Sequence, residues 1–398
     1  MKVNLKKKIY IFKMILNFLL FNLFILLFFL IRDIIKYNIN FSEFKERLGI
    51  NTLKCRNYDY LIHGASCGEL QSIIPIIKIL KNKNKNFLIS GWTPSGVRLL
   101  KKKGINNTIL KPYETFINIF FFILNYKFKK LIIIESDIWP IFIIIIKLLR
   151  IKIIAINYKK KEKKKLRNIL HNLLIDKIFL KNNINISDYL SKYEFLGNTK
   201  LLNVKTDLIE LPKKNNIITI VSAHENEFFI HKKIIKYCID NNVKIIYIPR
   251  YLSDNLSNKH KFKDFNYYLL DKQTINFDNI VNNNNLIVCN LYGIVQLALS
   301  VSKICIMGGT YNNVGCHNLV EPIINKCLII MGPSFHTQKD MFDVLNIEKC
   351  IYICSNYKII INTLKILLLS DSENKINNTI NYLKKYNINI KKKLELAL

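Results

Sequence analysis

The stretch Met307-Gly-Gly-Thr-Tyr-Asn-Asn-Val-Gly-Cys-His317-Asn-Leu-Val-Glu321-Pro322 is the most informative part of this sequence. The apolar residues 303–307 predict a strand that ends in two glycines, and the Asn-x-x-Glu-Pro sequence predicts the start of a helix. Glycines let a backbone approach a ligand closely, and the N-terminus of a helix presents free N–H groups to an anion. This combination predicts a pocket for a nucleotide-sugar.

Short apolar segments alternate with helical segments on both sides of a polar stretch at 211–216. This alternation indicates βαβ units and parallel sheets. We therefore expect an α/β fold with two Rossmann-like domains around a central cleft. The predicted strands are 59–65, 87–90, 131–135, 152–157, 177–180, 217–222, 244–249, 286–289, 303–307 and 327–331, and the predicted helices of the first half are 69–81, 94–103, 115–126 and 139–149.

The composition excludes some classes of function. The 398 residues include 61 Lys and Arg against 28 Asp and Glu, a formal charge of +33. Abundant Lys, Asn and Ile indicate a drift of the whole composition, and no Arg-rich arm, zinc finger or RNA-binding motif is present, so we expect no nucleic-acid partner. Nine scattered cysteines without a C-x-x-C pair indicate a reducing compartment rather than disulfides or a zinc site.

The N-terminal residues 1–36 predict a membrane anchor. A basic cluster, Lys6–Lys8, precedes an apolar run from Ile15 to Ile31 that only two asparagines interrupt. This length is at the lower limit for crossing a bilayer, roughly 17–25 residues. No small-residue cleavage site follows, which argues against a signal peptide. Basic residues flank both ends, so the sequence does not decide the orientation or whether the segment spans the membrane or lies on it.

Polar residues at predicted strand ends are the candidates for chemistry. In the first half, Glu69 follows a strand and is a candidate general base, although Ser66-x-x-Glu69 also has the spacing of a capping box. Thr93 is either a helix cap or a ligand contact. Glu135 ends a very apolar strand, where an unpaired charge would be costly. We expect the apolar segment 116–124 to be buried, with lipid contact as the alternative.

In the second half, Arg250 ends a strand and is a candidate for binding a phosphate or carboxylate. Lys200, near the junction of the halves, is a weaker cationic candidate. Asn318-x-x-Glu321 again fits a capping box. His224 and His317 form no metal-ligand pattern with other residues, so we expect no metal.

These segments, in this order, resemble the Kdo transferase family, which adds 3-deoxy-D-manno-oct-2-ulosonic acid (Kdo) to the lipid A precursor. The similar blocks are Arg47-Leu-Gly49, His63-Gly-Ala-Ser-Cys-Gly-Glu69, Thr93-Pro-Ser-Gly96, Glu135-Ser-Asp-Ile-Trp-Pro140, Gly197-Asn-Thr-Lys200, Ser222-Ala-His-Glu225, Pro249-Arg250, His317-Asn-Leu-Val-Glu-Pro322 and Met331-Gly-Pro333. The similarity covers nearly the whole chain.

The resemblance implies a GT-B fold, with an acceptor domain at 37–210 and a CMP-sugar-binding domain at 211–398 whose last helix packs back on the first domain. It implies an inverting, metal-independent transfer from CMP-Kdo to lipid IVA without a cofactor, at the cytoplasmic face of the inner membrane. By the same resemblance, Glu69 is the base. The donor contacts would be Arg250, Gly308, Gly309, Asn318 and Glu321, with Ser66, Thr93, Glu135, Lys200 and His317 as further candidates.

Four segments depart from the family pattern. Tyr292-Gly293-Ile294 stands where the family has Met-Gly-Glu, and Tyr251 stands in place of a histidine. Cys316 replaces the second glycine of Gly-Gly-His, and Asn157-Tyr158-Lys159 replaces Asn-Ala-Arg. Two other interpretations therefore stay open. One is a GT-B transferase that uses a UDP-sugar on a lipid acceptor, and the other is a degenerate membrane protein without catalysis.

Overall fold

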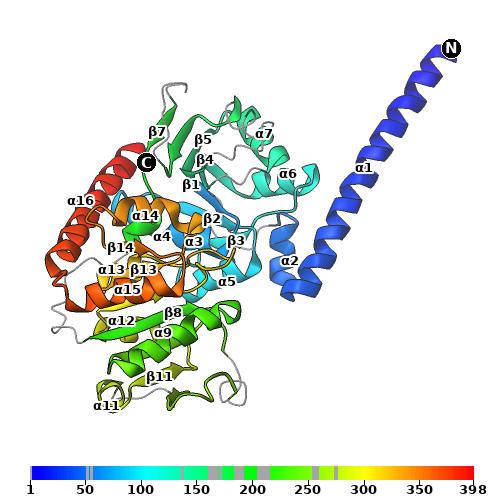
Figure 1. The fold of residues 1–398 in the computed structure, drawn as a ribbon. Coiled ribbons are helices and arrows are strands. Elements are labelled where there is room, and N and C mark those ends of the chain that lie inside the picture. The colour runs from blue at the N-terminus through cyan, green and yellow to red at the C-terminus, as the bar shows by residue number, and fades with distance from the viewer. Residues whose placement is uncertain are drawn as a thin grey trace. The chain divides into compact units, whose positions relative to one another are not determined.

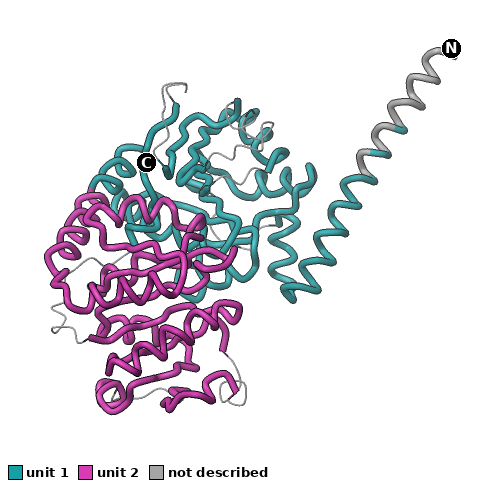
Figure 2. Tube along the Cα trace, in the orientation of Figure 1, with its two compact units in different colours: residues 1–203, 389–398 teal, residues 204–388 magenta. Residues whose placement is uncertain are grey.

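The computed structural model describes residues 2–50, 53, 57–135, 139–159, 169, 173–182, 192–203, 216–252, 260–272 and 277–398. It divides the chain into two compact units (Figure 2). Unit 1 comprises residues 1–203 together with 389–398, and unit 2 comprises residues 204–388. The predicted boundary at 210/211 and the central residues of the 135–140 block, 136–138, lie outside the described residues.

Unit 1 contains a seven-stranded parallel sheet with the order β3-β2-β1-β4-β5-β6-β7 (Figure 1). Its strands are β1 (Asn57–Gly64), β2 (Phe87–Gly91), β3 (Thr108–Leu110), β4 (Lys127–Ile134), β5 (Lys152–Tyr158), β6 (Lys177–Leu180) and β7 (Tyr193–Phe195). Between them lie α3 (Cys67–Ser72), α4 (Ile74–Asn82), α5 (Pro94–Lys102), α6 (Phe116–Asn125) and α7 (Pro140–Leu148), and the 3₁₀ helix η2 (Thr199–Asn203) follows β7. The strand order reverses between β1 and β4, and ligands bind at such reversal points in open α/β sheets.

Unit 2 repeats this architecture with the order β10-β11-β9-β8-β12-β13-β14, again parallel. Its strands are β8 (Ile217–Ala223), β9 (Lys244–Pro249), β10 (Tyr268–Leu270), β11 (Leu286–Cys289), β12 (Ile304–Met307), β13 (Leu328–Met331) and β14 (Ile351–Ile353). The helices are α9 (Phe228–Asp240), α11 (Phe277–Asn283), α12 (Val295–Val301), α13 (Val320–Ile324), α14 (Lys339–Leu345), α15 (Tyr357–Leu369) and α16 (Glu373–Ala397), with 3₁₀ turns η3 (Glu225–Glu227) and η4 (His336–Gln338). The order reverses between β8 and β12.

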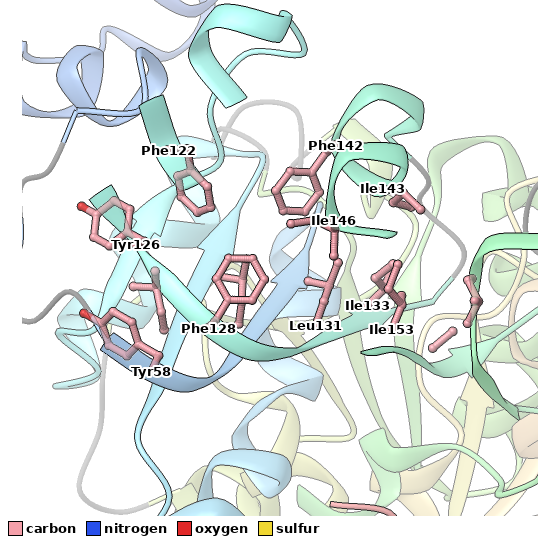
Figure 3. Close-up of a cluster of buried hydrophobic side chains, with 14 of the residues drawn as sticks. Tyr58, Phe122, Tyr126, Phe128, Leu131, Ile133, Phe142, Ile143, Ile146 and Ile153 are labelled. Carbon is pink, nitrogen blue, oxygen red and sulfur yellow. The ribbon is translucent and has the colours of Figure 1, made fainter. Parts of the chain in front are cut away.

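Buried apolar side chains hold each sheet to its helices. In unit 1, Leu131 and Ile153 of the sheet pack against Phe122 of α6 and Phe142 of α7 (Figure 3). Phe122 and Phe142 meet edge to face, with ring centroids 6.1 Å apart. Burying one such side chain contributes about 1.5–3 kcal/mol to the free energy of unfolding. The near-continuous apolar strands are typical of parallel sheets covered on both faces.

The N-terminal residues form α1 (Lys2–Tyr37), which is followed by α2 (Phe41–Arg47). A buried ion pair fixes α1 to unit 1, because Asp33 Oδ2 lies 2.8 Å from Arg47 Nε and both side chains are fully buried. The Arg47 guanidinium also donates to the carbonyl oxygens of Lys111, at 2.8 Å, and Trp92, at 2.6 Å. Arg47-Leu-Gly49 is therefore a structural block.

The expected anchor at 1–36 lies within α1. In this helix Asn17 and Asn22 interrupt the apolar run, and Arg32 and Asp33 directly follow it. Across the described residues, no helix reaches the combination of length and hydropathy that crossing a bilayer requires.

The C-terminal residues 389–398 belong to unit 1. There the Tyr60 hydroxyl donates to the carbonyl oxygen of Leu398, and the Lys83 ammonium donates to that of Glu395. These bonds attach the end of α16 to β1 and to the residue that follows α4.

Candidate functional site

Glu69 lies in the first turn of α3, after the carboxyl end of β1. The Ser66 hydroxyl accepts a hydrogen bond from the Glu69 N–H at 3.3 Å, and Glu69 Oε2 accepts one from the Ala65 N–H at 2.6 Å. Both bonds stabilise the turn, so the capping role that the spacing predicted for Ser66 is present. The Glu69 side chain is only half-buried, which leaves its carboxylate within reach of a substrate.

Glu135 and Lys200 form an ion pair at the same edge of the sheet. Glu135 directly follows β4 with φ at +62°, and its N–H donates to the carbonyl oxygen of Ile156 at 2.7 Å. Its Oε1 lies 3.0 Å from Lys200 Nζ, and the two side chains are 31% and 37% exposed. A Cβ placed on Gly68 would lie 3.9 Å from Lys200 Nζ, so the ammonium is close to the start of α3. The charge of Glu135 is therefore paired.

Asn157 fixes the segment that carries Lys200, a role that was not predicted. It lies one residue before the end of β5, with φ at +58°. Its Nδ2 donates to Thr199 Oγ1 at 2.7 Å, and its Oδ1 accepts from the Thr199 N–H at 2.9 Å. Both residues are fully buried. Asparagine tolerates the left-handed region better than most residues. An asparagine near the end of a predicted strand was therefore the feature of the sequence that could have indicated this role.

Thr93 occupies a packing position beside α3. Its N–H donates to the carbonyl oxygen of Ala65 at 3.0 Å, which links the strand ends of β1 and β2. Its hydroxyl makes no hydrogen bond with described residues. A Cβ on Gly96 would lie 2.6 Å from Leu70 Cδ1 and 2.9 Å from Thr93 Oγ1, so the Thr93-Pro-Ser-Gly96 block allows α5 to approach α3.

In unit 2, the segment after β12 packs closely against the end of β8. A Cβ on Gly308 would lie 2.3 Å from the carbonyl oxygen of Ser222, and one on Gly309 would lie 2.8 Å from that of Gly315. Gly309 also has φ at +78°, and its N–H donates to Glu227 Oε2 at 2.7 Å. Contacts within the chain therefore require both glycines.

His224, His317 and Tyr251 form a row of rings beside Gly309. The two imidazoles stack with an interplanar angle of 8°, and their Nε2 atoms are 3.4 Å apart. Tyr251 meets His224 edge-on at 6.1 Å and is 71% exposed. Burial lowers the pKa of His317, and Arg250 and His224 lower it further. Arg250 follows β9 and is exposed, so its charge is available to an anion.

Asn318 and Glu321 stand at the start of α13. Asn318 Oδ1 accepts from the N–H groups of Val320 and Glu321, at 3.0 and 3.4 Å, and its Nδ2 donates to Glu321 Oε2 at 3.3 Å. Burial raises the pKa of the Glu321 carboxyl, and the hydrogen bond from Asn318 opposes this. Asn318, one residue before the N-cap Leu319, therefore binds N–H groups of the first turn of α13, and the same amide orients the Glu321 carboxylate.

Ile294, at the position where the family has a glutamate, is only 7% exposed and immediately precedes α12. The neighbouring Gly293 has φ at +84° and open space around it. An apolar side chain is compatible with this buried position.

Comparison with known proteins gives consistent results. A family model described as 3-deoxy-D-manno-octulosonic-acid transferase (kdotransferase) matches residues 42–181. The curated 3-deoxy-D-manno-octulosonic acid transferase of Aquifex aeolicus is 28% identical over 326 residues, 79% of this chain and 87% of that protein. The enzyme of the same name from Chlamydia muridarum is 24% identical over 346 residues, 77% and 78% of the two chains. A solved glycosyltransferase from Rickettsia africae aligns with a TM-score of 0.56 at 14% identity, covering 86% of this chain and 98% of that chain.

The two parallel sheets and the likeness to the Rickettsia africae structure define a glycosyltransferase fold of the GT-B type. A fold alone does not fix a reaction. The family model and the curated relatives identify the chain as a glycosyltransferase that is similar to the Kdo transferases.

Proposed function

We propose that this protein transfers Kdo from CMP-Kdo to the lipid A precursor, lipid IVA, in lipopolysaccharide biosynthesis. The observation that carries the proposal is the group of polar residues at the strand-order reversal of unit 1. There a half-buried Glu69 follows β1, and Glu135, which pairs with Lys200, follows β4, in a chain that is similar to Kdo transferases.

Glu69 acts as the general base in this proposal. It takes the proton of the acceptor hydroxyl while the hydroxyl oxygen attacks the anomeric carbon of Kdo with inversion, and CMP leaves with the electron pair of the broken C–O bond. Lys200 supplies a cation close to the start of α3, and Glu135 holds that cation in place at 3.0 Å. A fixed positive charge stabilises the negative charge that develops during the transfer, without a metal.

On the donor side, we assign the phosphate of CMP to Arg250, whose exposed guanidinium follows β9. Asn318 and Glu321 would bind polar groups of the nucleotide, since their side chains already share a hydrogen bond at the start of α13. His317 would line the same site. Gly308 and Gly309 would contribute close backbone packing there.

Membrane association completes the proposal. Helix α6 has five large apolar side chains that are 43–58% exposed, contrary to the expected burial of this segment: Phe116, Ile117, Phe120, Phe121 and Leu124. The N–H of Phe116 donates to Asn22 Oδ1 of α1 at 3.2 Å, so the start of α6 lies beside α1. Exposed apolar surface on a chain of formal charge +33 suits an anionic lipid surface. We place the protein at the cytoplasmic face of the inner membrane.

The test is an assay of the membrane fraction with CMP-Kdo and tetra-acylated lipid A precursor, read by mass spectrometry of the lipid. Wild-type protein should add Kdo, and Glu69→Gln should lower kcat by about 10²–10⁴-fold. Glutamine keeps an oxygen for the Ala65 N–H, so the melting temperature should stay close to that of wild type. Absence of transfer by a folded wild-type protein would overturn the proposal and favour the degenerate interpretation.

Transfer that survives in Glu69→Gln would overturn only the assignment of the base. Glu225→Gln is the matched control. Its carboxylate is 77% exposed and pairs only with Lys261 among described residues, so the variant should retain wild-type activity.

A further inference from the structure

The turn between β8 and α9 contains a buried carboxylate that the proposed chemistry does not use. Glu227 ends η3 and is 1% exposed. No ion pair with a described residue involves it. A buried charge is costly unless other groups compensate for it, so the partners of this carboxylate indicate what it does.

Both partners are backbone N–H groups of the segment after β12. Glu227 Oε2 accepts from the Gly309 N–H at 2.7 Å, and Oε1 accepts from the Tyr311 N–H at 2.7 Å. Hydrogen bonds to a carboxylate are about twice as strong as neutral ones. The carboxylate therefore fixes two N–H groups of a glycine-rich segment, which the sequence predicted to be close to an anionic ligand.

The same turn contacts the following residues at two more points. Asn226 Oδ1 accepts from Asn312 Nδ2 at 3.0 Å, and the ring of His224 stacks on that of His317. On the other side, Thr310 Oγ1 donates to the carbonyl oxygen of Met307 at 2.6 Å and accepts from the Gly332 N–H at 2.8 Å. The path from β12 to His317 is thus held at both ends and along its length.

We propose that Glu227 is a positioning residue of the donor site, which rests on the proposed function for the identity of the donor. Its carboxylate occupies the N–H groups of Gly309 and Tyr311, so these groups do not bind the donor phosphate. It instead fixes the backbone from which His317 and Asn318 project. The phosphate is left to side chains such as Arg250.

The substitution Glu227→Gln tests this directly. Glutamine has nearly the same shape, but its NH₂ group faces one of the two N–H donors, which removes one hydrogen bond and sets two donors against each other. We expect the Kd for CMP and the KM for CMP-Kdo to rise at least about tenfold, the effect of losing about 1.4 kcal/mol of binding. The KM for the lipid acceptor should stay within twofold. Glu225→Gln, the same change on the exposed side of the turn, should alter neither constant.

Three measurements decide the outcome: calorimetric titration with CMP, steady-state kinetics, and hydrogen–deuterium exchange of the peptide that covers 308–317 without ligand. Faster exchange at Gly309 and Tyr311, together with weaker CMP binding, supports the inference. Wild-type exchange, or a lower melting temperature with unchanged CMP affinity in the folded protein, overturns it. If Glu227→Gln does not fold, Asn226→Ala removes only the contact to Asn312, and unchanged exchange and CMP affinity in that variant overturn the inference.

The outcomes also separate this inference from the proposed function. If wild-type protein fails to bind CMP or to transfer Kdo, the function is wrong, whereas the exchange experiment still decides whether Glu227 fixes the segment.

Discussion

Three non-glycine residues at strand ends have a left-handed backbone: Glu135 with φ at +62°, Asn157 at +58° and Ser222 at +55°. Each such residue costs about 1–3 kcal/mol, and such strain clusters at functional sites. In unit 1 the compensation is visible, because Glu135 pairs with Lys200 and Asn157 makes two hydrogen bonds to Thr199. Glu135 directly follows β4 and Ser222 lies near the end of β8, and each of these strands borders the reversal point of its own sheet.

Replacing Asn157 by Ala should affect both stability and catalysis. The change leaves Thr199 without two buried partners and places a Cβ without polar compensation at φ +58°. We expect a loss of about 2–3 kcal/mol in the free energy of unfolding, measured with urea. Because Lys200 directly follows Thr199, the loss of these bonds should displace the Lys200 cation. We therefore expect a decrease in kcat that is larger than the change in KM. Unchanged kcat in the folded variant would contradict a positioning role for Asn157.

Lys200→Met should reduce catalysis with little effect on stability. The Glu135–Lys200 pair is about one-third exposed, and pairs of this kind contribute about 0–1 kcal/mol to stability. The melting temperature should therefore hardly change, while kcat falls by at least about tenfold because a cation that stabilises the transition state is lost. Lys129→Met is the control, since Lys129 is 79% exposed in its pair with Asp59. A large loss of stability without loss of activity would assign the pair a structural role.

Acid should destabilise the protein through two buried histidines. Burial lowers the pKa of both His63 and His231 from 6.5 to about 3. Since the folded pKa lies below the unfolded one, their stabilising effect is complete above pH 6.5 and is lost as the pH falls toward 3. Each should contribute a slope of about 1.4 kcal/mol per pH unit in that window.

His231→Phe should remove the contribution of one titrating group to this slope. The free energy of unfolding, measured with urea between pH 7 and pH 5, should therefore depend less steeply on pH than in the wild type. Neither ring nitrogen of His231 has a hydrogen-bond partner among described residues, so phenylalanine should be tolerated. An unchanged slope would show that His231 does not titrate in this range.

At the scale of elements, the central strands could be predicted from the sequence and the edges could not. Each strand predicted from the apolar runs is present, and β6, β9 and β11 have the predicted bounds. The strands β3, β7, β10 and β14 were not among the predicted strands, and each is a three-residue strand at the edge of its sheet. An edge strand pairs on one side only and needs no long apolar run, so its pattern is too short to recognise.

Helix α6 also shows what the sequence pattern could not predict. Its almost uniformly apolar sequence has no polar face, so periodicity could not identify the exposed side. Only Asn118, Ile119 and Phe122 are buried.

Two phenylalanines of α6 therefore make a matched pair. Phe122→Ala should cost about 3–5 kcal/mol in the free energy of unfolding, since Phe122 is fully buried. Phe120→Ser, at a side chain that is 49% exposed, should leave stability within about 0.5 kcal/mol and weaken co-sedimentation with anionic vesicles. Unchanged vesicle binding by Phe120→Ser combined with Phe121→Ser would exclude α6 from the lipid contact.

At the scale of the whole molecule, the alternation of strands and helices in the sequence predicted two similar sheets. It could not predict the contacts within each site. Glu135 and Lys200 are separated by 65 positions, and Glu227 and Gly309 by 82. Strand order, which local patterns do not specify, brings such residues together. For the candidate residues, single sequence spacings could not separate capping from chemistry. Ser66 makes the capping bond of α3, whereas Asn318 lies one residue before the N-cap of α13 and binds N–H groups of its first turn.

The ion pair between Asp33 and Arg47 also fixes the angular phase of α1. An α-helix turns about 100° and rises 1.5 Å per residue, so the direction of every side chain before Asp33 is set by its count from that residue. One alanine inserted between Asn22 and Asp33 would rotate the preceding part of α1 by about 100° around its axis, whereas four would return it to within about 40°. The direction in which the apolar face of α1 points is thus set by the number of residues between that face and Asp33.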